Sequence, residues 1–129
     1  MAVTQDSLMA LQAMGKEFTY TERDSMYYAL GIGMGADQMD RQELEFCYEK
    51  AQKVVPSQAT AIAFDDSIFW DCGIDVVKAV HGEQRLTLHQ PLPAAATVIS
   101  DVRCTDAFDK GKGRGAIILL ETVLTDKAT

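Results

Sequence analysis

Hydrophobic residues recur along the chain with two different periods, which predict where helices give way to strands. Thr21 and Asp24 have the spacing of a capping box, in which the threonine hydroxyl satisfies an orphan backbone amide at a helix start. A helix is therefore expected from Glu22 to Leu30. Glycine favours the exit of a helix, and three glycines follow at alternate positions: Gly31, Gly33 and Gly35.

The next two segments predict one strand and one buried helix. Leu44, Phe46 and Tyr48 alternate with acidic residues, which is typical of a strand with one solvated face. Pro56 is tolerated at the start of a helix, where its missing amide is not needed. The alanine-rich stretch Ser57–Phe64 that follows is expected to be the main, well-buried helix.

Strand signals dominate the second half of the chain. Apolar and β-branched residues recur from Ile74 to Leu88, and Pro91 and Pro93 then interrupt backbone pairing. The stretches Thr97–Asp106 and Ala116–Leu124 are rich in strand-forming residues and are joined by a short glycine-rich turn, which predicts a hairpin. Helices followed by at least three consecutive strands predict an α+β domain, with an antiparallel sheet packed on one main helix.

The length of 129 residues is enough for one domain with a core of its own. Residues 1–15 carry one short apolar stripe, formed by Leu8, Leu11 and Met14, which is expected to make an edge contact or a partner surface. We therefore expect a lead-in over residues 1–15 and a single domain over residues 16–129.

The composition excludes several classes of partner. Hydrophobic residues make up 47% of the chain and charged residues 24%, as in a globular protein. Twelve basic against nineteen acidic side chains leave a net charge of −7, so the chain has no general affinity for nucleic acid or an anionic membrane. No apolar run approaches the length of a membrane span. A polyanionic ligand therefore has to be held by a local basic patch.

The cysteines do not form a metal motif or a disulfide framework. Cys47, Cys72 and Cys104 are an odd number and lie far apart in the sequence. The chain has two histidines besides them, and no pair of ligands has the short spacing of a zinc motif, so no metal site is expected. The first residues lack the regions of a signal peptide. We therefore expect reduced thiols and a cytoplasmic protein.

The turn of the predicted hairpin carries a concentrated basic motif. Lys110, Lys112 and Arg114 lie within five residues and are separated by glycines. Glycine lets backbone amides approach a phosphate closely while the cationic side chains neutralise its charge. The alternative is an ordinary solvated hairpin tip, and the residue types leave both interpretations open.

A second candidate is the pair His81 and Gly82, which interrupts the strand pattern. Glycine inside a strand often marks a bulge or a place where a ligand approaches the backbone. A lone histidine is also common as a structural hydrogen bonder, so this interpretation stays beside the functional one. Because this pair and the basic turn are expected on neighbouring strands, one ligand is expected to reach both.

Seven short motifs occur after Gly15: Tyr20-Thr21-Glu22-Arg23-Asp24, Tyr28-Ala29-Leu30-Gly31, Phe46-Cys47-Tyr48-Glu49, Val55-Pro56, His81-Gly82-Glu83-Gln84, Pro91-Leu92-Pro93 and Asp109-Lys110-Gly111. In order and approximate spacing they resemble the N-terminal half of type 2 (R-specific) enoyl-CoA hydratases of the MaoC-like dehydratase family. The resemblance covers nearly the whole chain after the first fifteen residues. The chain departs from the family after Pro56, where Ser57 and Gln58 replace a threonine and an apolar residue.

The resemblance implies a hot-dog fold, in which an antiparallel sheet wraps around a central helix, as one half of a double hot-dog. In this family the N-terminal unit helps to hold the acyl-CoA substrate, and no cofactor is used. The resemblance therefore implies that His81, Gly82 and Lys110 contact the CoA thioester. No role is carried over to Lys112 or Arg114.

The catalytic residues of the family belong to its second unit, in a G-D-x-N-P-x-H motif that supplies an aspartate and a histidine for acid–base chemistry. The present chain contains no asparagine, so it lacks this motif. We therefore expect an acyl-CoA-binding unit that completes an R-specific 2-enoyl-CoA hydratase with a C-terminal catalytic unit. The alternative is a non-catalytic acyl-CoA-binding or assembly subunit that pairs with a separate catalytic chain. A thioesterase with the same fold is the least favoured of the three functions, because the expected central helix Ser57–Phe64 contains no convincing carboxylate for catalysis.

The end of the sequence carries a further expectation. In the resembling family the chain turns after the segment that matches Ala116–Leu124 and returns as another strand, so the domain is expected to be truncated before its last strand. An unpaired apolar edge is a template for another chain. We expect Ile117–Val123 to be covered by a partner or a second copy, in a homo- or hetero-oligomer. The alternative is that Met1–Gly15 covers this edge.

Overall fold

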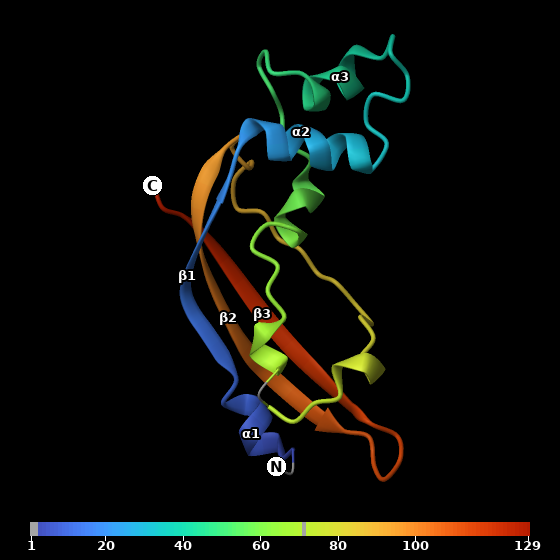
Figure 1. Ribbon diagram of the computed structural model, residues 1–129, viewed down its shortest axis with the longest axis vertical. Helices are drawn as coiled ribbons and strands as arrows, with labels where there is room; N and C mark the ends of the chain where they lie inside the picture. Colours follow the sequence, from blue (N-terminus) through green and yellow to red (C-terminus); the bar gives the residue numbers. More distant parts are fainter. Residues whose placement is uncertain (1–2, 71) are drawn as a thin grey trace. The chain divides into compact units, whose positions relative to one another are not determined.

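The computed structural model describes residues 3–70 and 72–129 (Figure 1). The helices and strands within these residues are, in order, α1 (Gln5–Met9), β1 (Gln12–Tyr20), α2 (Glu22–Gly31), α3 (Arg41–Cys47), η1 (Pro56–Thr60), η2 (Ser67–Phe69), η3 (Val76–Lys78), β2 (Ala96–Asp109) and β3 (Ala116–Asp126), where η denotes a 3-10 helix. None of the described helices is long and apolar enough to span a membrane.

The three strands form an antiparallel sheet in the order β1-β2-β3. The Cys104 amide donates to the Leu11 carbonyl over 3.0 Å, and the hydroxyls of Thr19 and Thr97 lie 2.8 Å apart, which fixes the register of β1 on β2. On the other side of β2, the Lys127 amide donates to the Thr97 carbonyl over 2.9 Å. The hairpin and the α+β class expected from the sequence are both confirmed.

The middle strand β2 separates a buried face from an exposed one. Val98, Val102 and Cys104 are buried, and Arg103 and Thr105 between and beside them are exposed. This alternation is the period of two that a strand imposes on its side chains. The strands at both edges of the described sheet are more exposed than β2.

The chain divides into two compact units, and each is built from segments that are distant in the sequence. Unit 1 comprises Met1–Glu17, Asp65–Glu83 and Ile99–Thr125. Unit 2 comprises Phe18–Phe64, Gln84–Val98 and Asp126–Thr129.

The core of unit 1 is small and includes residues that were expected to lie outside the domain. Leu8, on α1, is buried against Cys104 and Ala107 of β2. The side-chain amide of Gln5 adds a hydrogen bond of 3.1 Å to the Ala107 carbonyl. Gly15, the last residue of the expected lead-in, lies within β1, and Gln5 and Leu8 contact β2. Residues Gln12–Gly15 of this segment lie in β1, which pairs with β2 in the described sheet, so they do not cover the free edge of β3.

Unit 2 is organised around α2, which begins where the sequence indicates. The Thr21 hydroxyl accepts from the Asp24 amide over 3.3 Å, and the Asp24 carboxylate accepts from the Thr21 amide over 2.8 Å. This reciprocal pair is the expected capping box. On the buried side of the helix, Ser25 and Ala29 are each only 1% exposed. The predicted helix is therefore confirmed, extended by one residue to Gly31.

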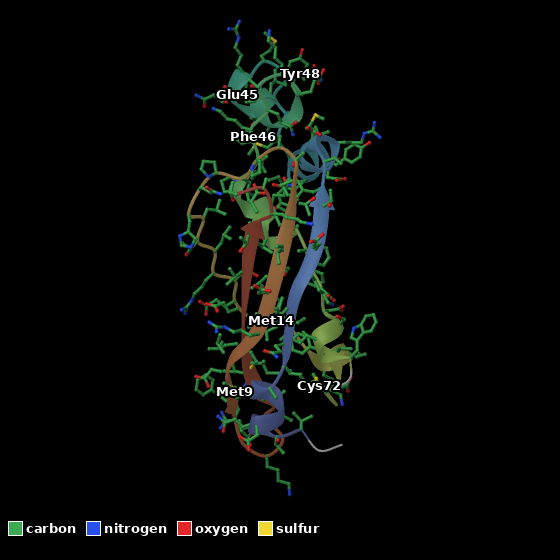
Figure 2. All side chains as sticks on the ribbon, turned by 90° about the vertical axis from the view of Figure 1, so that its left-hand side faces the viewer. Met9, Met14, Glu45, Phe46, Tyr48 and Cys72 are labelled. Atoms are coloured by element: carbon green, nitrogen blue, oxygen red, sulfur yellow. The ribbon has the colours of Figure 1, made fainter. Side chains whose placement is uncertain are left out.

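The strand expected around Leu44–Tyr48 is wrong, because this segment forms α3. The Asp40 carboxylate caps it by accepting from the amides of Gln42 and Glu43, over 2.8 and 3.4 Å. Figure 2 shows Glu45, Phe46 and Tyr48 gathered around this short helix and the turn that follows it. The helix cap therefore decides the structure of this segment. The alternation of apolar and acidic residues does not produce a strand, because no described strand lies beside it to pair with.

The main helix expected over Ser57–Phe64 is also wrong in type and length. The segment forms η1, which ends at Thr60, and Ala63 adopts a positive φ of 58° that an α-helix does not allow. Its most buried side chain is Gln58, at 3% exposure, rather than one of the alanines. The longest described helix is α2 instead.

The strand pattern from Ile74 to Leu88 does not produce a strand in the described structure. Val76–Lys78 forms η3, capped by the Asp75 carboxylate, which accepts from the Val77 amide over 3.2 Å. Residues 79–88 follow without regular structure. A strand exists only where a neighbour satisfies its backbone, and β1, β2 and β3 do not pair with this segment.

Candidate functional site

The hairpin between β2 and β3 holds its basic tip in a defined conformation (Figure 1). The Lys110 amide donates to the Gly115 carbonyl over 3.0 Å and closes the tip at its base. Within the tip, the Arg114 amide donates to the Gly111 carbonyl, also over 3.0 Å. Gly111, Gly113 and Gly115 have φ values of 98°, 76° and 78°, which residues with a side chain rarely adopt. The glycines are therefore required by the turn itself.

The three cations of the tip are exposed and unpaired. Lys110, Lys112 and Arg114 make no ion pair among the residues that the structure describes. The nearest carboxylate along the chain, that of Asp109, accepts a hydrogen bond of 2.8 Å from the Gly111 amide. Other cations of the chain are engaged by carboxylates: Lys16, Lys53, Lys78 and Arg103. The tip therefore carries a local positive charge to which an anion can bind.

His81 and Gly82 lie in the irregular segment after η3 and are both exposed. They belong to unit 1, as does the hairpin tip. A side chain built at Gly82 would meet no atom within 4 Å, and its φ lies outside the left-handed region. Neither packing nor backbone conformation within the described chain therefore requires glycine at this position. The expectation that the pair lies on a strand next to the hairpin is wrong, since no described strand contains it.

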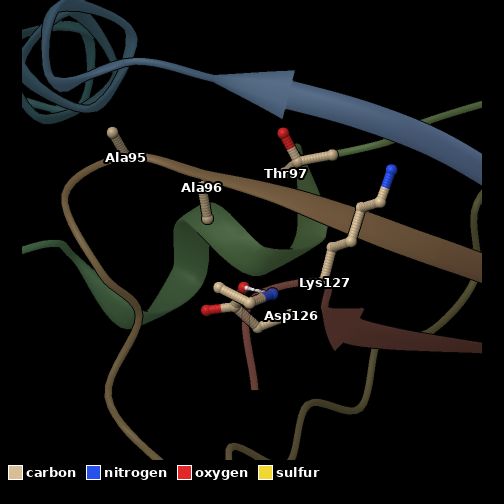
Figure 3. A pocket seen from close by; sticks show the side chains of 6 residues that line it. Ala95, Ala96, Thr97, Asp126 and Lys127 are labelled. Carbon is tan, nitrogen blue, oxygen red and sulfur yellow. Dashed lines mark hydrogen bonds between the residues drawn. The ribbon is translucent and has the colours of Figure 1, made fainter.

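A shallow pocket of about 290 Å³ lies in unit 2, near the start of β2 and the end of β3 (Figure 3). It is lined by Ala95, Ala96, Thr97, Asp126, Lys127 and Ala128. Its carboxylate, from Asp126, accepts a hydrogen bond of 2.9 Å from the Ala128 amide. Burial, and next the charge of Asp126, raise the pKa of Tyr20. None of the three candidate residues, His81, Gly82 and Lys110, lines this pocket.

Cys47, Cys72 and Cys104 are free thiols. Burial, and next the charge of Glu43, raise the pKa of the Cys47 thiol. Burial also raises the pKa of Cys104, whose thiol donates to the Asp106 carbonyl over 3.3 Å. A raised pKa lowers the fraction of reactive thiolate. Within the described residues, no three metal-ligating side chains are grouped.

One charged cluster was not anticipated from the sequence. The Lys16 ammonium on β1 pairs with the Asp65 carboxylate and contacts the Ser67 hydroxyl at 3.0 Å. The hydrogen bonds from Lys16, and next those from Ser67, lower the pKa of Asp65 to about 2. A carboxylate that stays ionised above this pH is a poor proton donor at neutral pH, so its role is to attach η2 to β1. Lys16 lies 49 residues before Asp65 in the chain, and no local pattern relates the two.

Comparisons with known proteins identify the family of the chain. Residues 18–129 match the family model described as the MFE-2 hydratase 2 N-terminal domain. A protein of Mycobacterium tuberculosis named enoyl-CoA hydratase ChsH3 is 30% identical over 131 residues, which cover 97% of this chain and 45% of that protein. The peroxisomal enoyl-CoA hydratase 2 of Arabidopsis thaliana is 34% identical over 129 residues, covering 91% of this chain and 40% of that protein.

A third relative places the same domain in a longer protein. The peroxisomal multifunctional enzyme type 2 of Mus musculus is 31% identical over 103 residues, which cover 74% of this chain but 14% of that protein. The chain thus spans less than half the length of each of these relatives. An α+β architecture with an antiparallel sheet fits the hot-dog fold of the matched family. The chain belongs to the hydratase 2 N-terminal domain family, in agreement with the resemblance seen in its sequence motifs.

Proposed function

We propose that this chain is the acyl-CoA-binding N-terminal unit of an R-specific 2-enoyl-CoA hydratase. The complete enzyme would add water reversibly to a trans-2-enoyl-CoA and yield an (R)-3-hydroxyacyl-CoA. The observation that carries this proposal is the match of residues 18–129 to the hydratase 2 N-terminal domain. The relatives named enoyl-CoA hydratase support the substrate class.

In this proposal, three residues of unit 1 contact the substrate. Lys110 binds a phosphate of the CoA moiety, because its ammonium is exposed and unpaired among the described residues at the base of the hairpin tip. Gly82 allows close approach to the backbone, which accounts for a glycine that the chain's own packing does not require. His81, beside it, offers an imidazole for a polar contact with the thioester end.

The acid and base of the reaction come from a second unit in this proposal. Hydration needs one group to activate water and one to protonate the α-carbon, both within hydrogen-bond reach of the substrate. The sequence contains no asparagine and therefore no G-D-x-N-P-x-H motif. The catalytic role is thus assigned to a C-terminal hot-dog unit, and this chain contributes binding and orientation.

The same binding residues are compatible with a second candidate function. The chain is then a non-catalytic acyl-CoA-binding or assembly subunit that pairs with a separate catalytic chain in a homo- or hetero-oligomer. The two candidates share the site residues His81, Gly82 and Lys110. They differ in whether the catalytic unit is part of the same polypeptide.

Complementation between two purified chains tests both candidates. The 129-residue chain is mixed with a separately produced hydratase 2 C-terminal unit that carries the G-D-x-N-P-x-H motif, and hydration of crotonyl-CoA is followed by loss of enoyl absorbance. We expect the mixture to exceed the sum of the separate chains, and the Lys110→Ala chain to support less activity at low substrate concentration. A matched control is Lys50→Ala, which changes an exposed lysine in unit 2. No binding of crotonyl-CoA and no gain on mixing would contradict the proposal.

A further inference from the structure

Two cations of the hairpin tip are not used by the proposed function. Lys112 and Arg114 are exposed and make no ion pair among the described residues. They flank Gly113, whose φ of 76° fixes the turn between them. Because the Arg114 amide is bonded to the Gly111 carbonyl, the two side chains project from a turn whose backbone is already ordered. A ligand that binds them does not need to order the loop first.

The electrostatics of the chain make this pair unusual. Its net charge is −7, yet the tip places three positive charges within five residues. The carboxylate of Asp109, at the start of the turn, accepts a hydrogen bond from the Gly111 amide and forms no ion pair with a described side chain of the tip. Exposed charges of the same sign that lie close together in the sequence repel one another, and a bound dianion relieves that repulsion. The tip therefore has the chemistry of a phosphate-binding site.

The three cations lie at different levels of the hairpin tip. Lys110 lies at the base, where its amide closes the hairpin on Gly115. Lys112 and Arg114 lie farther along the tip, beyond that closure. In coenzyme A, the diphosphate adjoins the pantetheine arm, and the 3′-phosphate lies beyond it on the ribose. A CoA moiety whose diphosphate meets Lys110 carries a further phosphate, and the same turn offers two more exposed cations for it.

We infer that Lys112 and Arg114 bind the 3′-phosphate of the CoA moiety, which rests on the acyl-CoA binding proposed above. A terminal phosphate monoester carries nearly two negative charges and accepts several hydrogen bonds. The arginine guanidinium matches two of its oxygens, and the lysine ammonium adds a compact charge from the other side of Gly113. The site discriminates between coenzyme A and its 3′-dephospho form.

The test compares two ligands on two forms of the full chain by calorimetry. We expect the parent to bind crotonyl-CoA roughly 10-fold or more tightly than crotonyl-3′-dephospho-CoA, the range for charged hydrogen bonds. The Lys112→Ala/Arg114→Ala variant is expected to bind both ligands alike, at the affinity of the parent for the dephospho form. Both substitutions are at exposed positions, and an unchanged thermal midpoint checks that the fold is intact.

The outcomes separate this inference from the function on which it rests. A parent chain that binds crotonyl-CoA and a double variant that still prefers it over the dephospho form would overturn the 3′-phosphate site alone. A parent that binds neither ligand would overturn the acyl-CoA function together with this site. The Lys50→Ala chain is the matched control, and it is expected to discriminate between the ligands as the parent does.

Discussion

The side-chain amide of Gln58 donates to the hydroxyl of Ser25 over 3.0 Å, and that hydroxyl donates in turn to the carbonyl of Ala94 over 2.8 Å. Ser25 and Gln58 are 1% and 3% exposed. The two hydrogen bonds connect α2, η1 and the segment before β2 inside unit 2. Two linked hydrogen bonds thus run through the interior of unit 2, and loss of the Ser25 hydroxyl leaves the buried Gln58 amide and the half-buried Ala94 carbonyl without these partners.

Replacement of Ser25 by alanine is therefore expected to destabilise the fold by about 1–3 kcal/mol, the cost of leaving buried polar groups without partners. Urea unfolding followed by circular dichroism measures the change. Ser57→Ala is the control, since the Ser57 hydroxyl bonds to the Tyr28 hydroxyl at an exposed position. Equal free energies of unfolding for the Ser25→Ala variant and the parent would contradict the role of this chain of hydrogen bonds.

The Lys16–Asp65 pair predicts a dependence of stability on pH. The pKa of Asp65 is about 2 in the fold, below its ordinary value of 3.8. A carboxyl whose pKa is lower in the folded state stabilises the fold above the ordinary value, and this contribution is lost as the pH falls from about 4 towards 2. Because 43% of the Lys16 side chain is exposed, solvent screening keeps the effect modest.

The measurement compares the free energies of unfolding of the parent and of Asp65→Asn between pH 2 and pH 6. We expect the variant to be less stable at pH 6 and the difference to shrink below pH 4. Asp66→Asn changes the neighbouring exposed carboxylate and is expected to follow the parent at each pH. A difference for Asp65→Asn that stays constant over the whole range would show that the pair does not carry the effect.

Lys110→Ala is expected to weaken binding of crotonyl-CoA by about 1–3 kcal/mol, the range for hydrogen bonds to charged groups. The affinity of the parent should also fall as salt is added, because screening weakens the attraction between exposed charges. Calorimetry at two salt concentrations measures both effects. Identical affinities of the variant and the parent would make the hairpin tip an ordinary solvated turn.

The 129-residue chain alone is expected to show no hydratase activity on crotonyl-CoA. It lacks the motif that would place an aspartate and a histidine on the substrate, and a binding unit without them cannot supply the acid and the base. Turnover is measured against the uncatalysed rate. Activity above that rate, abolished by His81→Ala, would make His81 a catalytic base and would reverse the division of roles.

The free edge of β3 is expected to pair with a strand of another chain or of a second copy. The strand lies at the edge of the described sheet, and Ile117, Leu119 and Val123 on it are 48%, 45% and 48% exposed. An exposed apolar edge offers unpaired backbone groups as a template. Light scattering at micromolar concentration and amide exchange test this. A monomer with slow exchange throughout residues 117–123 would contradict the prediction.

Local signals in the sequence predicted those parts of the fold that depend on neighbouring residues. The capping box at Thr21 and Asp24 located α2, and the glycine-rich turn located the hairpin. The same kind of signal was present but overlooked at α3, where Asp40 stands three residues before Glu43. Apolar and acidic residues do alternate around Leu44 and Phe46. A strand also needs a neighbouring strand to pair with, and the alternation alone does not show whether one is present.

Interactions between distant parts of the chain were not predictable in this way. Asp65 pairs with Lys16, which lies 49 residues earlier in the chain. Gln58 departs from the family pattern, and its burial follows from Ser25, which lies 33 residues earlier. The sequence indicated which residues are candidates for the site: His81, Gly82 and Lys110. It did not predict how these residues are arranged in space, because the strand expected to carry His81 is absent from the described sheet.

The ion pair between Arg103 and Glu121 has a consequence for the solubility of the chain. Glu121 is the one charged residue between Ala116 and Leu124, and its carboxylate lies 2.6 Å from the guanidinium of Arg103. When two copies of β3 align antiparallel about their centres, two such carboxylates face each other, and like charges in that position oppose pairing. Glu121 thus disfavours this one register of pairing between copies of the chain, which limits aggregation along the edge, whereas a strand with a basic residue opposite Glu121 meets no such repulsion.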